Sequence, residues 1–261
     1  MAMNNGSMLE IAGLTKNYCA ENGTIVHALQ GIDLDIAVND FVCIVGPSGC
    51  GKSTLLRIMA GLEKETAGVA RYLGKAIDRP TPQIGMVFQE YSLLPWRTVI
   101  DNVGLGPEFA NMPKRQRQLL ATEYLQLVGL EKFAQAYPHE LSGGMRQRVA
   151  IARALANDPD VLLMDEPFGA LDAHTRILLQ KELLRIWERH RKTIVFVTHS
   201  VDEAIFLADR ICVMSGTSGR IMEMIDVTMP RPRERSNPLY GQLAERILRM
   251  LEGEVVKMGI L

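Results

Sequence analysis

The chain has 261 residues, of which 47% are hydrophobic and 23% are charged, and its formal net charge at pH 7 is −1. This balance is typical of a globular protein with a sizeable core. It argues against nucleic acid as the main partner, because no basic excess is available to neutralise phosphates. No apolar run approaches the roughly 18–20 residues of a membrane span, and the polar N-terminus lacks the layout of a signal peptide.

The first predicted layer is antiparallel. Residues 9–36 mix alternating apolar positions with a turn at Glu21-Asn22-Gly23, a pattern typical of paired β-strands. Five short apolar, β-branched runs then predict strands that are buried on both faces of a parallel α/β sheet. These runs are residues 41–45, 84–88, 161–164, 194–198 and 211–214.

A glycine-rich loop separates the strand predicted at 41–45 from a helical stretch at 55–60. Its sequence fits the P-loop pattern G-x-x-x-x-G-K-[ST], in which glycines let backbone N–H groups turn toward phosphate oxygens. Lys52 can reach the β- and γ-phosphates, and the Ser53 hydroxyl can ligate Mg²⁺. An ordinary strand-to-helix turn would not account for a match at every specified position. The loop therefore predicts binding of a nucleoside triphosphate by Gly46, Pro47, Ser48, Gly49, Cys50, Gly51, Lys52, Ser53 and Thr54.

The four cysteines form no CxxC pair and no zinc-binding spacing, which fits a reducing, cytoplasmic compartment. Cys43 and Cys212 lie in strand-like runs and are expected to be small buried hydrophobes. Cys50 precedes a helix N-terminus, which should lower the pKa of its thiol. We interpret it as tolerated in the loop rather than catalytic, with a liability to oxidation as the alternative.

Helical periodicity dominates residues 89–160, with the clearest runs at 114–128 and 143–156, and it returns at 173–190. One face of the last helix is expected to be buried and to comprise Leu178, Leu179, Leu183, Ile186 and Trp187. Its opposite face should be exposed to water through Lys181, Glu182, Arg185 and Glu188. Beyond residue 229, a basic, proline-containing connector precedes a short helix predicted at 239–251.

Two further motifs carry chemistry. The apolar run at 161–164 ends in Asp165 and Glu166, which suit an approach to Mg²⁺ and polarisation of an attacking water, respectively. Upstream, Ser142 is followed by Gly143 and Gly144 at the start of a helix, where free N–H groups can hold an anion. Taken by themselves, the two carboxylates could simply mark a strand that meets a turn, and the serine could simply cap an ordinary helix. Neither explains the combination with a P-loop.

In this order the motifs make the chain resemble the ATP-binding-cassette (ABC) ATPases along nearly its whole length. The resemblance implies an α/β fold: a P-loop NTPase (RecA-like) core with an antiparallel β subdomain and an inserted helical subdomain. It implies one ABC ATPase domain over 1–261, in which residues 1–88 and 161–229 form the nucleotide-binding core with its β subdomain. The helical signature subdomain would then cover 89–160 and a C-terminal tail 230–261. ATP and Mg²⁺ are the implied ligands.

The resemblance also assigns roles to single residues. Ser142, Gly143 and Gly144 would close over ATP held by a second ATPase subunit, expected to be another copy of this chain. Asp172 would lie in the D-loop that meets this subunit. Tyr18 would stack on adenine, as aromatic side chains stack on nucleic-acid bases at about 1–3 kcal/mol per base, although a strand position explains a lone tyrosine. Gln89 and His199 follow strands and match the residues that contact Mg²⁺ and the γ-phosphate, respectively. Both join Glu166 in the catalytic set, and Gln89 also joins Ser53 and Asp165 in the metal set.

A short helical insert, a single P-loop and the lack of a membrane span favour a transporter subunit that works with a separate permease. Residues 90–103 would receive a permease helix, or would simply pack within the helical lobe. Together with the proline- and arginine-rich segment near 229–238, they are similar to the cassettes of bacterial nitrate, sulfonate and taurine importers.

That similarity implies a small anionic solute, an indirect solute-binding partner and a place on the cytoplasmic face of the inner membrane. The particular solute stays open, as does export. A non-transport ABC protein is the rival class, and a small-molecule kinase gains no support from residues 141–148.

Overall fold

The computed structural model describes residues 6–21, 23–216 and 219–257, which divide into two compact units. Unit 1 comprises Met1–Pro80 and Thr193–Leu261, and unit 2 comprises Thr81–Lys192. The segment predicted as helical, residues 89–160, falls in unit 2, which also takes in 81–88 and 161–192. Among the described residues, no helix combines the length and the apolar character required to cross a membrane.

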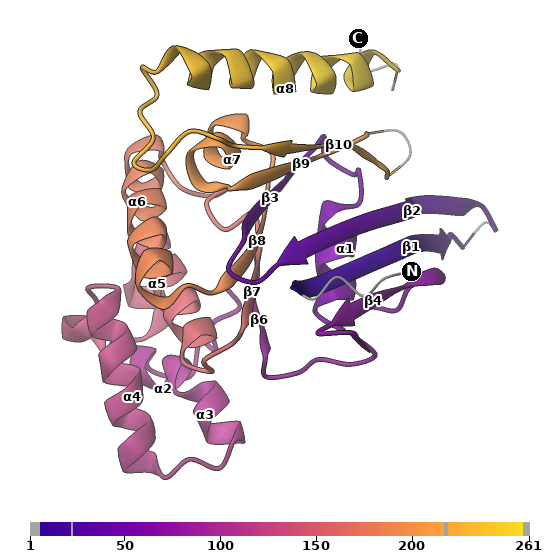
Figure 1. Cartoon of the computed structure of the whole chain (residues 1–261). Helices are drawn as coiled ribbons and strands as arrows, with labels where there is room; N and C mark the ends of the chain where they lie inside the picture. Colours follow the sequence, from indigo (N-terminus) through magenta and orange to yellow (C-terminus); the bar gives the residue numbers. More distant parts are fainter. Residues whose placement is uncertain (1–5, 22, 217–218, 258–261) are drawn as a thin grey trace. The chain divides into compact units, whose positions relative to one another are not determined.

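Unit 1 contains an antiparallel sheet in the order β2-β1-β4-β5, of which Figure 1 labels β2, β1 and β4. Its strands are β1 (Ser7–Cys19), β2 (Ile25–Ala37), β4 (Ala67–Tyr72) and β5 (Lys75–Ala76). The antiparallel layer predicted over 9–36 is confirmed, because Leu9 pairs with Ile36 and Tyr18 pairs with Val26. The predicted turn lies partly outside the described residues, at Asn22.

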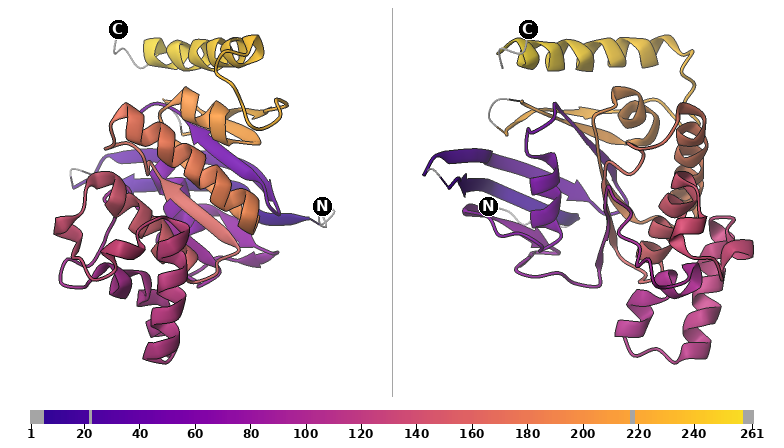
Figure 2. Two further views of the ribbon diagram at one scale, coloured as in Figure 1. Left: turned by 90° about the vertical axis from the view of Figure 1, so that its left-hand side faces the viewer. Right: turned by 180° about the vertical axis from the view of Figure 1, so that it is seen from behind.

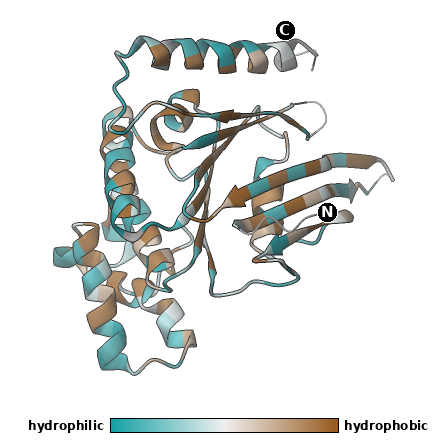
Figure 3. Cartoon of the chain, viewed as in Figure 1, coloured by the Kyte–Doolittle hydropathy of each residue, from teal (hydrophilic) through white to brown (hydrophobic). Residues whose placement is uncertain are grey.

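Alternation along β2 explains why this sheet forms. Ile32, Leu34 and Ile36 are buried, while Asp33 and Asp35 between them are exposed. A period of two places apolar side chains on one face of a strand, and Figure 3 shows it as brown and teal bands along β2.

The second group of strands in unit 1 is mainly parallel. β3 (Phe41–Val45) pairs in parallel with β8 (Thr193–Thr198) and with β9 (Arg210–Met214), and β10 (Ile221–Asp226) pairs antiparallel with β9. Every residue of β3 and β8 is buried, as the continuous apolar runs predicted. Helices α1 (Lys52–Met59), α7 (Val201–Leu207) and α8 (Pro238–Lys257) complete the unit.

Unit 2 holds a parallel pair of strands, β6 (Ile84–Val87) and β7 (Val161–Asp165). The chain between them is helical, as expected. It forms α2 (Val99–Val103), α3 (Leu105–Phe109), α4 (Lys114–Leu127), η1 (Glu131–Phe133), η2 (Pro138–Glu140) and α5 (Gly143–Leu155). After β7 comes α6 (Ala173–His190), whose bounds match the predicted helix. Figure 2 shows the helices of this unit from two further sides.

The predicted buried face of α6 is correct at four of its five positions. Leu179, Leu183, Ile186 and Trp187 are buried, but Leu178 is 52% exposed. Successive residues of an α-helix turn by about 100°, so Leu178 lies off the stripe that is centred on its neighbours. The indole N–H of Trp187 donates to the main-chain oxygen of Lys192 at 2.9 Å, which confirms a core role for this side chain.

The helix predicted at 239–251 was too short, since α8 begins at Pro238 and continues to Lys257. Several short elements were not predicted individually: β4, β5, β10, α2, α3, η1, η2 and the seven-residue helix α7. Apart from α7, each has six residues or fewer. Over such lengths neither helical nor alternating periodicity is well defined.

We expect Leu183→Ala to lower the free energy of unfolding by about 2–5 kcal/mol, because the substitution leaves a cavity under α6. Leu178→Ala is the matched control in the same helix and should lower it by no more than about 0.5 kcal/mol. Urea denaturation followed by circular dichroism measures both variants. Equal losses would contradict the assignment of the buried face.

Candidate nucleotide-binding site

The P-loop lies between β3 and α1 in unit 1. Gly49 and Gly51 have φ angles of 81° and 94°, a region that favours glycine. A Cβ on Gly51 would lie 2.4 Å from the carbonyl oxygen of Ala28, and one on Gly46 would lie 2.9 Å from the main-chain oxygen of Met214. Both glycines therefore allow a close approach of backbone that a side chain would prevent.

The anion-binding end of this loop is open. α1 begins at Lys52 with no side-chain cap and no acidic residue in its first turn. No carboxylate of that turn therefore competes with a phosphate for the first N–H groups of the helix. Ser48 and Gly49 are exposed, and Ser53 and Thr54 are half-buried. The Lys52 ammonium donates to the main-chain oxygens of Gly46 and Pro47, each at 2.8 Å, which places its charge inside the curl of the loop. Such a cradle fits the phosphates of ATP.

The expectation for the thiol of Cys50 was wrong. This side chain is buried, and burial raises the pKa of the thiol, while the charge and hydrogen bonds of Lys52 oppose that shift without cancelling it. Cys43 and Cys212 are also buried, as predicted, and burial raises the pKa of both thiols. The helix N-terminus does not determine the pKa of the Cys50 thiol, because the free-energy cost of a thiolate in an apolar environment exceeds the stabilisation from the nearby charge.

Tyr18 lies near the end of β1 and is 38% exposed. Burial raises the pKa of its phenol, a hydrogen bond to Glu63 raises it further, and one with Thr54 lowers it. The ammonium of Lys16 lies 4.9 Å from the centre of the ring. The contact with Thr54 places Tyr18 beside the last residue of the P-loop, where an adenine ring attached to bound phosphates could stack.

His199 is brought to the same end of the sheet as the P-loop. β3 and β8 are parallel, and Val45 pairs with Thr198, so Gly46 and His199 leave neighbouring strands at one edge. His199 is exposed. The structure therefore groups Tyr18, the P-loop and His199 within unit 1.

Unit 2 groups the carboxylates by the same rule. Val87 pairs with Met164, so Gln89 follows β6 at the edge where Asp165 ends β7 and Glu166 follows it. The side-chain amide of Gln89 lies 3.5 Å from Glu166 Oε2. Asp165 is buried, and Glu166 adopts a left-handed backbone conformation with φ 43°. Strain of this kind is found at sites where surrounding structure holds a side chain in a required direction.

Ser142 caps α5, because its hydroxyl accepts from the N–H of Met145 at 3.3 Å. Gly144 is sterically required, since a Cβ there would lie 2.7 Å from Thr175 Cγ2 of α6. The serine is exposed and no acidic residue occupies the first turn of α5. This helix end therefore presents N–H groups to an anion.

Asp172 caps α6 by accepting from the N–H of Thr175 at 3.0 Å, and these hydrogen bonds with Thr175 hold its pKa below the usual range. Its carboxylate is thus ionised and already engaged in structure. The side-chain contacts of the segment after residue 229 were missed by the sequence interpretation, and they are described below.

Comparison with known proteins identifies the family. The ABC transporter family matches residues 29–169. The taurine import ATP-binding protein TauB of Rhizobium johnstonii is 46% identical over 252 residues, which cover 94% of this chain and 96% of that protein. The aliphatic sulfonates import ATP-binding protein SsuB of Bacillus cereus is 43% identical over 253 residues, covering 97% and 99%.

A solved structure agrees with the fold. The dimeric, post-hydrolysis state of the ATP-binding cassette MJ0796, bound to ADP and Pi, matches with a TM-score of 0.76 and 35% identity, and the match covers 85% of this chain and all of that one. The predicted P-loop NTPase fold is therefore confirmed. The chain belongs to the ATP-binding subunits of the ABC transporters and is an ATPase.

Proposed function

We propose that this chain is the ATP-hydrolysing subunit of an importer that takes up a small anionic solute, of the sulfonate, taurine or nitrate type, through a separate permease. The observation that carries this proposal is the 43–46% identity, over nearly the full chain, to subunits named for taurine and sulfonate import. On this proposal the subunit lies at the cytoplasmic face of the membrane, and a solute-binding protein acts outside it.

ATP is held between two copies of the chain on this proposal. The N-terminus of α5, which is capped by the exposed Ser142, has donors that can receive a γ-phosphate, and the related cassette MJ0796 is dimeric with ADP and Pi bound. Each nucleotide then contacts the P-loop of one copy and Ser142, Gly143 and Gly144 of the other. Asp172 belongs to the segment that faces the partner copy.

The chemistry is hydrolysis by a positioned water. Glu166 accepts the proton of the attacking water, and the amide of Gln89 orients that carboxylate from 3.5 Å. His199 and Lys52 hold the γ-phosphate while charge builds on its oxygens. Tyr18 holds the adenine ring.

Mg²⁺ fits the donors that the chain offers. Within the described ranges, no group of three or more His, Cys, Asp and Glu side chains could hold a metal ion alone. Mg²⁺ is instead commonly bound by one or two protein oxygens together with substrate phosphates and water. Ser53, Gln89 and Asp165 would hold it, and the ion would neutralise charge on the phosphates.

A hollow of about 330 Å³ in unit 2 suits the cytoplasmic helix of a permease. Apolar side chains of Phe88, Leu105 and Phe109 line it, and Phe109 is 79% exposed. The guanidinium of Arg153 also lines it, donating to the main-chain oxygens of Tyr91 and Ser92. We propose that residues 89–160 act as the helical subdomain that transmits motion from Gln89 to this partner. On the same proposal, residues 1–88 and 161–229 form the nucleotide-binding core with its β subdomain, and residues 230–261 form the C-terminal tail.

Glu166→Gln should retain ATP binding and reduce hydrolysis by about 10²–10⁴-fold, because the amide cannot accept the proton. The variant should therefore accumulate as an ATP-bound dimer on size-exclusion chromatography. Lys52→Ala combined with Glu166→Gln is the control and should stay monomeric. If the single variant also stays monomeric with ATP while the parent chain hydrolyses normally, the shared site is wrong.

Tyr18→Ala should raise the Kd for ATP by about 5- to 150-fold, which corresponds to the loss of about 1–3 kcal/mol of stacking. Tyr18→Phe keeps the ring and should bind within about twofold of the parent chain. Inorganic tripolyphosphate, which lacks a base, should bind all three proteins equally. Calorimetric titration measures these affinities, and an equal loss of tripolyphosphate affinity in Tyr18→Ala would contradict the stacking role.

Co-purification of the chain from membranes tests the transport assignment, and we expect it to recover a permease. Recovery of a soluble complex alone would favour an ATP-driven clamp or assembly factor.

A further inference from the structure

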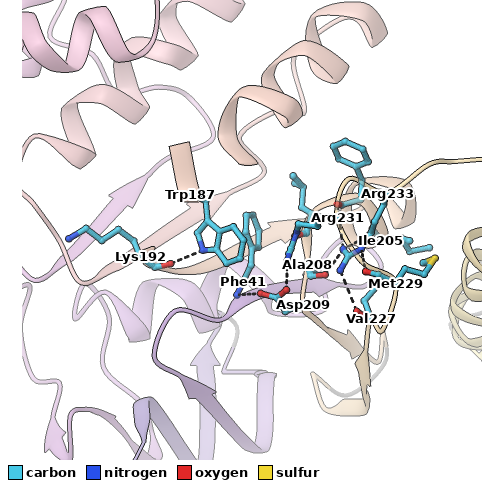
Figure 4. Close-up of polar contacts among 12 residues, drawn as sticks. Phe41, Trp187, Lys192, Ile205, Ala208, Asp209, Val227, Met229, Arg231 and Arg233 are labelled. Atoms are coloured by element: carbon cyan, nitrogen blue, oxygen red, sulfur yellow. Dashed lines mark hydrogen bonds and ion pairs between the residues drawn. The ribbon is translucent and has the colours of Figure 1, made fainter. Parts of the chain in front are cut away.

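The tail of unit 1 grips α7, the helix that follows His199. Three arginines in its first eight residues, Arg231, Arg233 and Arg235, all contact α7 or the residues at its ends. The sequence interpretation treated this segment as a connector. The structure instead shows Arg231 and Arg233 of this segment bonded to main-chain oxygens at the end of α7 (Figure 4).

The C-terminal end of α7 is held by Arg233. Its guanidinium donates to the main-chain oxygens of Ile205 at 2.7 Å and Ala208 at 2.5 Å, with further bonds to Met229 and Val227 of its own strand connection. Arg233 is only 6% exposed, and burial lowers the pKa of its guanidinium to about 10, so the group is still charged at neutral pH. It satisfies carbonyl groups that a helix end leaves without partners.

Arg231 strengthens the same end. It donates to the main-chain oxygen of Leu207 and pairs with Asp209, whose other carboxylate oxygen accepts from the N–H of Phe41 in β3 at 3.1 Å. The end of α7 is thereby tied both to the tail and to the central strand that leads into the P-loop.

The N-terminal end of α7 is held through Asp202. Both carboxylate oxygens of Asp202 accept from Arg235, each at 2.7 Å, in the bidentate geometry that fixes a carboxylate most firmly. The hydroxyl of Tyr240, in α8, lies 2.7 Å from Asp202 Oδ1 and 2.8 Å from its main-chain oxygen. Burial raises the pKa of this phenol far above its usual value, so it is a proton donor at neutral pH. The guanidinium of Arg235 also lies over the ring of Phe206 at 4.6 Å.

Asp202 is three residues from His199, and the intervening backbone is fixed. Ser200 caps α7 by accepting from the N–H of Glu203 at 3.3 Å, and its own N–H donates to Thr198 Oγ1 at 3.0 Å. The Thr198 hydroxyl in turn bonds to the buried carboxylate of Glu203. His199 therefore sits on a short, rigid connection between β8 and α7, and any displacement of the first turn of α7 moves it.

We infer that Arg235, Asp202 and Tyr240 form a clamp that positions His199 for hydrolysis, so that the C-terminal tail of this chain sets the catalytic rate. The clamp residues contact neither the nucleotide nor the attacking water in this proposal, so they are positioning residues. The inference rests on the proposed role of His199 toward the γ-phosphate. A displacement of about 1 Å at a reacting group can cost about 10²-fold in rate, which gives the clamp sufficient leverage.

The test is steady-state hydrolysis by the full chain with Mg²⁺ and ATP. Tyr240→Phe keeps the packed ring and removes one bond to Asp202, and Arg235→Ala removes the bidentate pair. We expect kcat to fall about 5- to 100-fold while KM for ATP stays within twofold. Arg235→Lys, which keeps the charge, should recover part of the rate. Arg246→Ala is the matched control, because it removes an ion pair between α8 and Glu223 of β10 without touching α7, and it should leave kcat unchanged.

His199→Ala separates this inference from the proposed function. In that background the clamp substitutions should cause no further loss of kcat, since they act through the missing imidazole. If His199→Ala itself leaves kcat unchanged, the proposed role of His199 fails. If His199→Ala lowers kcat but the clamp variants only lower the melting temperature, or lower kcat equally in both backgrounds, the clamp is overturned while the proposed function stands.

Discussion

Parallel pairing in register brings the ends of neighbouring strands to one edge, and in this chain those ends carry the residues of the proposed ATPase site. In unit 1 the pair Val45 and Thr198 delivers the P-loop and His199 together. In unit 2 the pair Val87 and Met164 delivers Gln89 beside the two carboxylates. Because β3, β7 and β8 are buried along their whole length, burial of their apolar side chains holds these strands in the sheet. The chemistry therefore depends on the packing of apolar residues that take no part in it.

The helices of the two units supply the proposed anion-binding N-termini and hold His199 in position. α1 and α5 both begin without an acidic residue in the first turn, which suits the binding of an anion at a helix N-terminus. α7 begins two residues after His199 and is held at both ends by the tail. The tail is thus not an appendage, because its arginines and Tyr240 determine where the histidine lies relative to the P-loop in the same unit.

The sequence predicted what is encoded locally. The P-loop, the strand ends and the helix at 173–190 each depend on contiguous residues, and the fold class followed from them. Leu178 and the thiol of Cys50 were misjudged because burial depends on tertiary neighbours. β4 escaped notice because Ala67, Gly68 and Ala70 have low strand propensity, which pairing with β1 overrides. The clamp could not be predicted from the sequence, because Arg235 and Tyr240 form hydrogen bonds with a residue more than 30 positions earlier.

Mixing two inactive variants tests most directly whether ATP is shared between copies. Lys52→Ala disables the P-loop, and Ser142→Arg blocks the N-terminus of α5. In a shared site, a dimer of one copy of each contains one intact pairing of P-loop and α5, so the mixture should regain a measurable fraction of hydrolysis that neither variant shows alone. A mixture that forms mixed dimers and stays inactive, or a Ser142→Arg protein that hydrolyses ATP at the full rate by itself, would contradict the account.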